Sequence, residues 1–297
     1  MHGKTKRVKV CTKPKPTPAP SHLIDASGYV WVDGAGNVYV SSGYLPSGAN
    51  GWVSKLSPTG TRLANFRSKS ALDGASGVAV DDAGNVYVAD LGSDRVVKFS
   101  SNGKEVASIG TPKSVPGELS APSGIGLDGV GHLYVADSNN SRIQVFTVDG
   151  QYVGAIGSYG PDPGQLERPL DVAVDGHGNL LVADSENSRV EEFSSSGTFV
   201  TVWGREGSGV GQFEHPKGIC LDAAGNVYVA DTGNRRIQKF ASDGTPLAQW
   251  STGDDEPVSP GVDSAGTVYV TEDVPGGSAG YGVAKFAPDG QLLSVWH

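Results

Sequence analysis

The chain has 297 residues, of which 43 are glycine and 18 are proline, and its formal net charge is −9. So many turn-forming residues argue against a helical protein and indicate one large all-β domain or two small ones. The first 20 residues carry six basic groups and no acid, so the remaining 17 basic and 32 acidic residues give a net charge of −15. A body this acidic repels phosphate backbones, which argues against nucleic acid as a partner.

The basic start of the chain is predicted to be a disordered tail or linker over residues 1–21, because its lysines and Arg7 run into the proline-rich segment KPKPTPAP. No apolar stretch reaches the roughly 18 residues that span a bilayer, and MHGKTKRVKV lacks the apolar segment of a signal peptide. We therefore expect no transmembrane segment and no export signal in the chain as given, and an envelope or extracellular location if a signal or anchor precedes it.

One ten-residue phrase recurs six times along the rest of the chain. The copies are DGAGNVYVSS from Asp33, DDAGNVYVAD from Asp81, DGVGHLYVAD from Asp128, DGHGNLLVAD from Asp175, DAAGNVYVAD from Asp222 and DSAGTVYVTE from Asp263. Successive aspartates are 48, 47, 47, 47 and 41 residues apart, which is the period of a propeller blade.

Each repeat predicts four short strands. In the third copy these are 125–128, 133–137, 142–146 and 151–157, all rich in β-forming residues and bounded by turn residues. The Asp-x-x-Gly turns suit a hairpin because aspartate bonds to backbone two residues on and glycine accepts positive φ. We predict that residues 22–297 form an all-β, six-bladed β-propeller with four antiparallel strands per blade. Since every blade holds its own four strands, blade 6 should close the ring by packing on blade 1.

The second turn of blades 2 to 5 keeps an aspartate and an arginine five residues apart. The pairs are Asp90 with Arg95, Asp137 with Arg142, Asp184 with Arg189 and Asp231 with Arg236. We expect them to tie the turn between strands two and three, rather than to form a ring of free arginines for an anion. The two cysteines suggest no disulfide, since Cys11 lies in the tail and Cys220 lies in the apolar run GICLD, where a buried structural residue fits.

Blades 1 and 6 depart from the repeat in matching ways. The stretch from strand two to strand three runs fifteen residues there, against ten elsewhere, and the Asp/Arg pair is lost. The resulting loops, 43–51 and 273–282, should lie side by side on one face, where long loops on a rigid scaffold tend to carry binding residues. The alternative is that terminal repeats are simply atypical. The candidate binding residues here are Tyr44, Asn50, Trp52 and Tyr281.

The turn that enters strand one should lie on the same face, at the mouth of the central channel. Asp171 stands where three other repeats have glycine, and Arg168, His215 and Lys217 lie near it in the repeat pattern. We predict that these four residues contribute to binding. Asp171 and Glu256 are the alternative ligands for one divalent metal ion such as calcium, whereas a three-histidine zinc site is not expected because only His215 faces this way.

The stretch GSGVGQFEHPKGICLDAAGNVYVADTGNRRIQKF, residues 207–240, resembles the NHL repeat, and blades 2 to 5 share its pattern. The resemblance covers about 275 residues and implies a six-bladed propeller, which members of that family use mainly to bind proteins, RNA or envelope ligands. Related six-bladed enzymes include amidating lyases, streptogramin lyases and gluconolactonase-like hydrolases. Fold alone does not choose among these functions.

We predict a non-catalytic binding or scaffold propeller that recognises a protein, peptide or glycan through one loop face, without a cofactor and as a monomer. No Ser/His/Asp or Cys/His arrangement has motif support in this sequence. The alternative is a metal-dependent lyase or lactone hydrolase working in the central channel. That enzyme would need at least three nitrogen or oxygen ligands converging on one point.

Overall fold

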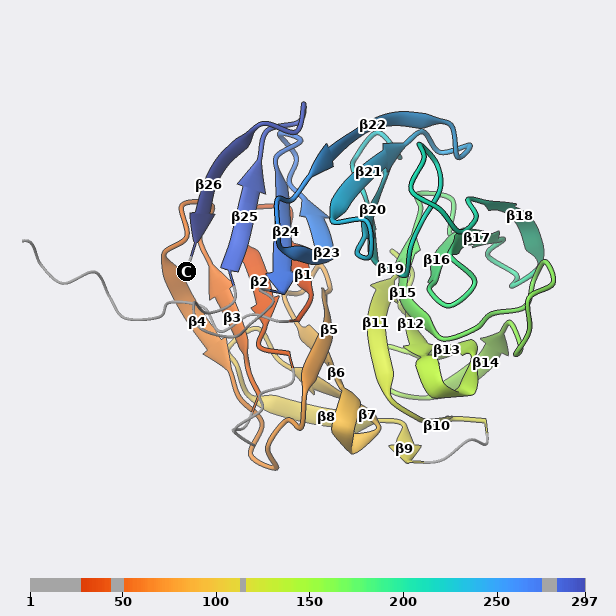
Figure 1. The fold of residues 1–297 in the computed structure, drawn as a ribbon. Coiled ribbons are helices and arrows are strands. Elements are labelled where there is room, and N and C mark those ends of the chain that lie inside the picture. Colours follow the sequence, from red (N-terminus) through yellow and green to blue (C-terminus); the bar gives the residue numbers. More distant parts are fainter. Residues whose placement is uncertain (1–27, 44–50, 113–115, 274–281, 297) are drawn as a thin grey trace, which may run out of the picture.

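Six four-stranded antiparallel sheets stand around a central channel, which confirms the predicted all-β, six-bladed propeller (Figure 1). The structure is a computed structural model, and it describes residues 28–43, 51–112, 116–273 and 282–296. Each sheet is one blade, built from four consecutive strands that run outward from the channel in chain order.

The first three blades follow the order of the repeats. Blade 1 holds β1 (Val30–Val32), β2 (Val38–Ser41), β3 (Val53–Leu56) and β4 (Arg62–Phe66). Blade 2 holds β5 (Ala75–Val80), β6 (Val86–Asp90), β7 (Arg95–Phe99) and β8 (Glu105–Ile109). Blade 3 holds β11 (Pro122–Leu127), β12 (His132–Asp137), β13 (Arg142–Thr147) and β14 (Tyr152–Ile156).

The last three blades repeat the arrangement. Blade 4 holds β15 (Pro169–Val174), β16 (Leu180–Asp184), β17 (Arg189–Phe193) and β18 (Phe199–Trp203). Blade 5 holds β19 (Pro216–Leu221), β20 (Val227–Asp231), β21 (Arg236–Phe240) and β22 (Pro246–Ser251). Blade 6 holds β23 (Glu256–Val262), β24 (Val268–Asp273), β25 (Gly282–Phe286) and β26 (Leu292–Trp296).

A few short elements lie outside the blades. The connection between blades 2 and 3 contains a parallel pair, β9 (Thr111–Pro112) and β10 (Glu118–Leu119). The second turns of these blades contain the 3-10 helices η1 (Leu91–Ser93) and η2 (Ser138–Asn140). These are the only helices in the described ranges, and no helix there is long and apolar enough to cross a membrane.

The repeated aspartate fixes the first turn of each blade. In blade 5, one carboxylate oxygen of Asp222 accepts the N–H groups of Ala224 and Asn226, each at 2.9 Å. The other oxygen accepts the hydroxyl of Tyr228 at 3.1 Å, and Gly225 takes the left-handed conformation with φ of 80°. The turn is therefore satisfied within its own repeat, which is why the phrase can recur without long-range partners.

The Asp/Arg pairs tie the second turn on the opposite face, as predicted. The arginine Nε lies 2.8, 2.8, 2.8 and 2.6 Å from the aspartate in blades 2 to 5. All four aspartate side chains are fully buried. The guanidinium groups are consequently occupied inside the blades and do not form an anion-binding ring.

The hydrophobic core lies between neighbouring blades. Between blades 4 and 5, for example, Leu181 and Val190 form one cluster with Val229, Phe213 and Phe240, all 4% exposed or less. The outermost strands instead expose much of their surface, as β4 and β26 show. No blade buries both of its faces alone, so burial depends on the neighbours in the ring.

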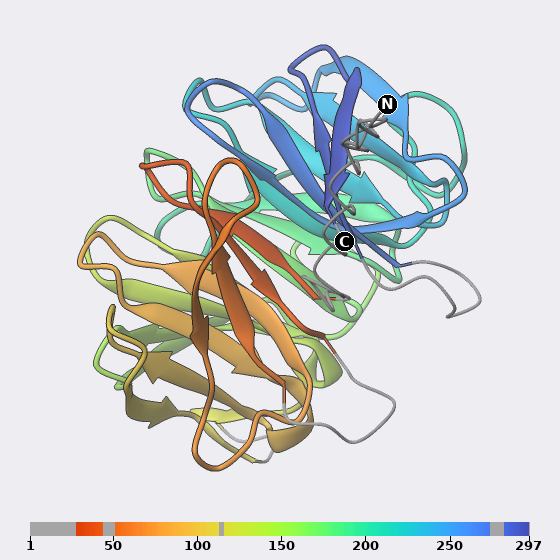
Figure 2. The same cartoon turned by 90° about the vertical axis from the view of Figure 1, so that its left-hand side faces the viewer.

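Blade 6 packs directly on blade 1 and closes the ring. Their shared core contains Val30, Val40 and Leu56 from blade 1 with Tyr269 and Val283 from blade 6. Figure 2 shows the first blade, in red and orange, beside the last, in blue. Since each blade is made of consecutive strands, no strand of the described chain crosses this seam, as the sequence predicted.

Candidate functional site

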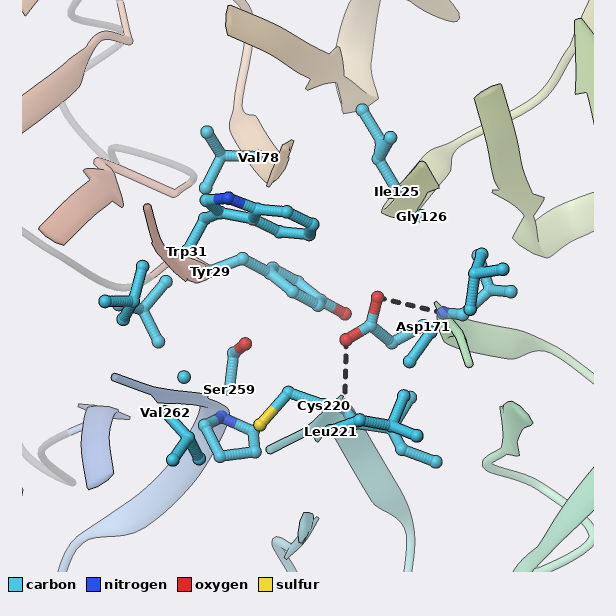
Figure 3. Close-up of a pocket in the computed structure, with 18 of the residues that line it drawn as sticks. Tyr29, Trp31, Val78, Ile125, Gly126, Asp171, Cys220, Leu221, Ser259 and Val262 are labelled. Carbon is cyan, nitrogen blue, oxygen red and sulfur yellow. Dashed lines mark hydrogen bonds between the residues drawn. The ribbon is translucent and has the colours of Figure 1, made fainter. Parts of the chain in front are cut away.

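The central channel contains a small cavity lined by both apolar and polar residues. Its volume is about 140 Å³, and its walls come from the innermost strands of all six blades, among them Trp31, Val78, Ile125, Val172 and Leu221 (Figure 3). Pockets for drug-sized ligands usually measure about 300–1,000 Å³. The channel therefore lacks the room that a substrate of that size needs.

Tyr29 spans the channel at the end where the first strands begin. It precedes β1 in blade 1, and its hydroxyl lies 2.9 Å from the Ser123 hydroxyl in blade 3. The same hydroxyl donates to the Leu170 carbonyl in blade 4, on the opposite side of the ring, at 2.8 Å. Burial of the Tyr29 phenol is the main cause that raises its pKa, and the nearby Asp171 carboxyl adds to the rise. The phenol therefore stays neutral and holds three blades together.

Asp171 lies inside the channel and points toward the Tyr29 ring (Figure 3). Its two carboxylate oxygens accept the N–H groups of Val172 and Ile219, both at 2.9 Å, so the side chain links β15 of blade 4 to β19 of blade 5. Burial raises its pKa to about 8, although these two hydrogen bonds act in the opposite direction. A Cβ on Gly124 would come 2.0 Å from Asp171 Oδ1, so the glycine of blade 3 makes room for this carboxyl.

This donor set does not fit a metal ion. Both Asp171 oxygens already serve backbone N–H groups, and the other polar side chains that line the cavity are Tyr29, Cys220 and Ser259. Glu256, the second predicted ligand, does not line the cavity. Calcium needs about six to eight oxygen ligands, and nowhere in the described chain do three His, Cys, Asp or Glu side chains gather around one point. The absence of a cofactor stays a prediction.

Cys220 was expected to be a buried structural residue. It lies on β19, where it is half-buried, packs against the core cluster between blades 5 and 6, and also lines the cavity. Burial raises the pKa of its thiol well above the usual range, followed by the charges of Asp171 and Asp222. The thiol is therefore protonated and a poor nucleophile.

Arg168 and His215 lie on the same face, as their positions in the repeat suggested. They are linked through a third residue, Glu186. Glu186, in the second turn of blade 4, accepts from Arg168 Nη1 at 3.2 Å, and its other oxygen lies 3.8 Å from His215 Nδ1. The arginine and histidine side chains are 61% and 58% exposed. Lys217 is half-buried on β19 and has neither a hydrogen bond nor an ion pair among the described residues. We call Arg168, Glu186, His215 and Lys217 the mouth cluster.

The backbone of the mouth cluster is unusual. Arg168 and His215 adopt left-handed conformations, with φ of 51° and 48°. Ala121 holds the same position in blade 3, with φ of 48°, and Gly74 in blade 2, with φ of 86°. A non-glycine residue in this region costs roughly 1 kcal/mol. Glycine would be cheaper for the fold, so the arginine and histidine side chains are not explained by the turn itself.

The long-loop residues are placed only in part. Tyr44, Asn50 and Tyr281 lie outside the described residues, so their predicted role is untested. Trp52 is described. Its backbone N–H donates to the Ser42 hydroxyl at 2.9 Å, and the Arg67 guanidinium lies 4.6 Å from the centroid of its ring. The indole is half-buried under this cation and not freely exposed.

Two residues of this face escaped the sequence analysis. Glu186 was missed because its partners lie 18 and 29 residues away in other turns, a proximity that no local pattern announces. Glu272 was missed because blade 6 was expected to lack the whole Asp/Arg pair. That expectation is wrong in one half: Glu272 faces Pro257 across the strands, as Asp231 faces Pro216, so the acid persists and only the arginine is lost. The change from VAD to VTE in the sixth repeat was the available signal.

Four segments of the chain match the NHL repeat family, over residues 72–99, 119–146, 166–193 and 213–240. They correspond to most of blades 2 to 5. Among curated proteins, no relative matches this chain.

Several solved structures share the fold at low sequence identity. A streptogramin B lyase is 16% identical with a TM-score of 0.64, covering 93% of this chain and 84% of its own. A catalytically inactive virginiamycin B lyase from Staphylococcus aureus with quinupristin is 15% identical with a TM-score of 0.64, covering 91% and 83%. A nidogen/laminin complex gives 19% identity and a TM-score of 0.65, covering 84% and 90%. Such identities show the propeller fold alone.

Proposed function

We propose that this chain, an NHL-repeat six-bladed β-propeller, is a non-catalytic binding module that holds a protein, peptide or glycan on the face of the mouth cluster. One contrast carries the proposal. The channel is spanned by Tyr29 and encloses only about 140 Å³, whereas the surface around it presents exposed polar and ionisable side chains. A partner that rests on the face can use these groups, but a substrate inside the channel cannot.

The chemistry of the mouth cluster favours a polar partner. Arg168 and His215 flank Glu186, and the half-buried Lys217 lies beside them in the repeat. Exposed ion pairs contribute only about 0–1 kcal/mol to stability, so exchanging them for contacts with a partner costs the fold little. A partner with a carboxylate and hydrogen-bonding groups, such as an acidic peptide or an anionic glycan, matches this surface.

The fold likenesses fit either a binding or an enzymatic propeller. The nidogen/laminin structure is a propeller within a protein complex, and the streptogramin B lyase is an enzyme on the same architecture. The shared fold is the only support for a metal-dependent lyase or lactone hydrolase, because the described residues of the channel do not offer a fitting set of metal ligands. The long-loop residues Tyr44, Asn50 and Tyr281 belong to the proposal as predicted contacts near the same face.

The test is partner capture with variants that spare the fold. Glycine suits the left-handed backbone, so Arg168→Gly and His215→Gly should fold normally while removing the side chains. His177→Ala is the matched control, since His177 is 89% exposed in a first turn on the opposite face. Peptides, glycans and proteins retained by the immobilised chain are first identified, and their affinities are then measured for each variant.

We expect the variant that combines Arg168→Gly and His215→Gly to bind its partner about tenfold more weakly or worse, as for residues near the centre of an interface. The His177→Ala control should bind unchanged. Equal retention by the unmodified chain, the double variant and the control would refute the proposed face. Turnover of a lactone or lyase substrate that depends on an added divalent metal and disappears in Asp171→Ala would favour the enzyme instead.

A further inference from the structure

A groove lies between blades 3 and 4 on the face of the first turns, opposite the mouth cluster. Its volume is about 700 Å³, and all of its lining residues belong to the described chain. Blade 3 contributes Tyr134, Val145 and Gly154, and blade 4 contributes the turns that contain Asp175 and Ser195. Pockets of this volume can hold small organic ligands. The groove therefore has the room that the central channel lacks.

In four other blades a lysine occupies the corresponding position. The ladder between the second and third strands pairs a tyrosine with a lysine in blades 1, 2, 5 and 6. Each lysine Nζ lies 4.8–5.2 Å from the centroid of that tyrosine ring. In blade 2, Lys98 faces Tyr87, and its Nζ donates to the Val148 carbonyl of blade 3 at 2.8 Å. The lysine side chain thus fills the space between its own blade and the next.

Blade 3 keeps the tyrosine but has lost the lysine. Tyr134 faces Val145 at this register. The Ser195 carbonyl of blade 4 corresponds to the Val148 carbonyl of blade 3, two residues before the conserved glycine of the turn. Within the described ranges, no hydrogen bond reaches the Ser195 carbonyl. Blade 3 therefore retains an aromatic ring and an unused acceptor, without the ammonium group that joins them in blade 2.

The groove of blade 3 is acidic. Asp128 of blade 3 and Asp175 of blade 4 line it, and no lysine or arginine does. Burial acts to raise the pKa of Asp128, but hydrogen bonds from the His132 backbone and imidazole and from the Val130 N–H hold it below its ordinary value, so the carboxylate is charged. The corresponding aspartates of blades 1 and 5 lie 3.6 Å from the lysine Nζ. A cationic ligand fits the charge of this groove.

Blade 4 shows the same relation between a lost lysine and a groove. Leu181 faces Glu192 there, so both members of the tyrosine–lysine pair are replaced. A second groove, of about 510 Å³, lies between blades 4 and 5, and Glu192 lines it. Both grooves therefore open where the lysine of the repeat is missing. Only the groove of blade 3 keeps the tyrosine ring.

We propose that the groove between blades 3 and 4 binds a small organic amine, with its ammonium group toward the Asp128 carboxylate and the Ser195 carbonyl and its apolar body against the Tyr134 ring. The lysines of the other blades show how this arrangement holds an ammonium group. Val130 and Val153, 82% and 54% exposed, line the groove and give an apolar body further surface to cover. A single lysine side chain would leave much of this groove empty. This inference goes beyond the proposed function, because it assigns a ligand to the face opposite the mouth cluster.

The test compares an amine with an alcohol of the same shape. Binding of phenylbutylamine to the full chain is measured by titration calorimetry at pH 8 and compared with binding of phenylbutanol, which has no charge. The amine should bind about tenfold more tightly or better. Val145→Lys restores the tyrosine–lysine pair of the other blades, so it should abolish amine binding without lowering Tm.

A second variant keeps the test decisive if Val145→Lys folds poorly. Gly154 pairs with Val145 in the ladder, and a Cβ added there would meet no atom within 4 Å, so Gly154→Leu should occupy the groove without moving the backbone. Ala107→Leu is the matched control, because Ala107 pairs with Lys98 at the same position of blade 2. The control should bind the amine as tightly as the unmodified chain does.

Equal affinities for the amine and the alcohol would overturn the proposal, and so would amine binding that survives in both groove variants. The competing occupants are the lysines of residues 1–21 and a lysine of a partner protein. If the chain's own lysines fill the groove, the full chain will not bind phenylbutylamine. If a partner's lysine is the ligand, N-acetyl-lysine amide will bind as tightly as phenylbutylamine, and either result refutes the small amine. None of these outcomes bears on the mouth cluster, whose glycine variants are read by partner capture.

Discussion

Replacing Glu191 should change stability in a way that depends on pH. It stands on β17 at the register of Gln144 in blade 3 and Gln238 in blade 5. Its side chain is fully buried, with Arg189 Nη2 2.8 Å from one oxygen. The same guanidinium also pairs with Asp184 at 2.8 Å, so one arginine faces two buried carboxyls.

The two glutamines show how the position is satisfied without a second charge. Gln238 accepts the Gly211 N–H at 3.0 Å and donates to the Gln212 carbonyl and to Asp231 at 2.7 and 2.9 Å. In Glu191→Gln the amide oxygen would keep the Gly164 N–H that the carboxylate now accepts, and the NH₂ would face Asp184. The substitution therefore restores the arrangement of the neighbouring blades.

The magnitude follows from the pKa. Burial raises the pKa of Glu191 from its ordinary 4.5 to about 7, with the Asp184 charge adding to the rise and Arg189 opposing it. Folding therefore favours the protonated acid, and its contribution to stability is complete below about pH 4.5 and lost as the pH rises through 7. The cost of ionisation approaches about 3 kcal/mol at alkaline pH, of which about 2 kcal/mol develops between pH 5.5 and 8.5.

Urea unfolding followed by tryptophan fluorescence at these two pH values tests this reasoning. Glu191→Gln should gain about 2 kcal/mol more over the unmodified chain at pH 8.5 than at pH 5.5. Gln238→Glu is the matched control, and it should lose stability mainly at pH 8.5. A gain of the same size at both pH values would refute the assigned ionisation.

Two further predictions concern the channel. Tyr29→Phe removes the hydroxyl that bonds to Ser123 and to the Leu170 carbonyl. The variant should lose about 1–3 kcal/mol of unfolding free energy, measured by urea unfolding. An unchanged unfolding midpoint would mean that the phenol does not join the blades. Asp171→Asn replaces one of two accepting oxygens by an NH₂ group facing a backbone N–H. Because the pKa of Asp171 is raised from 3.8 to about 8, the acid's contribution to stability is complete below about pH 4 and is lost as the pH rises through 8. The variant's deficit should therefore be larger at pH 6 than at pH 9. A deficit that does not depend on pH would contradict this.

The ring could be predicted from the sequence because its determinants are local. Asp222, Gly225 and Tyr228 complete a turn within seven residues, and the Asp/Arg pairs lie five residues apart. Each repeat thus carries its own hairpins, and a constant period then specifies the number of blades. The same reasoning placed Arg168 and His215 on one face correctly.

The site was less predictable because its contacts join distant parts of the chain. Tyr29 reaches residues 94 and 141 positions away, so nothing local shows that it spans the channel. Asp171 was grouped with the mouth residues from its place in the repeat, yet its carboxyl turns inward to the Ile219 N–H. Trp52 was expected to be available for binding, but the side chain of Arg67, the residue that follows β4, lies over its ring.

Some residues that break the repeat pattern are explained by contacts within the chain, and the others are the candidates for function. Asp171 breaks the glycine pattern, but Gly124 leaves room for its carboxyl and two backbone N–H groups donate to it, so the ring itself explains this residue. Glu272 receives no such compensation from the described residues, and glycine would serve the turns at Arg168 and His215 better. Real proteins break local rules chiefly at functional sites, where a gain elsewhere offsets the cost. A partner that brings an acidic group to the mouth cluster would supply the missing gain on that face.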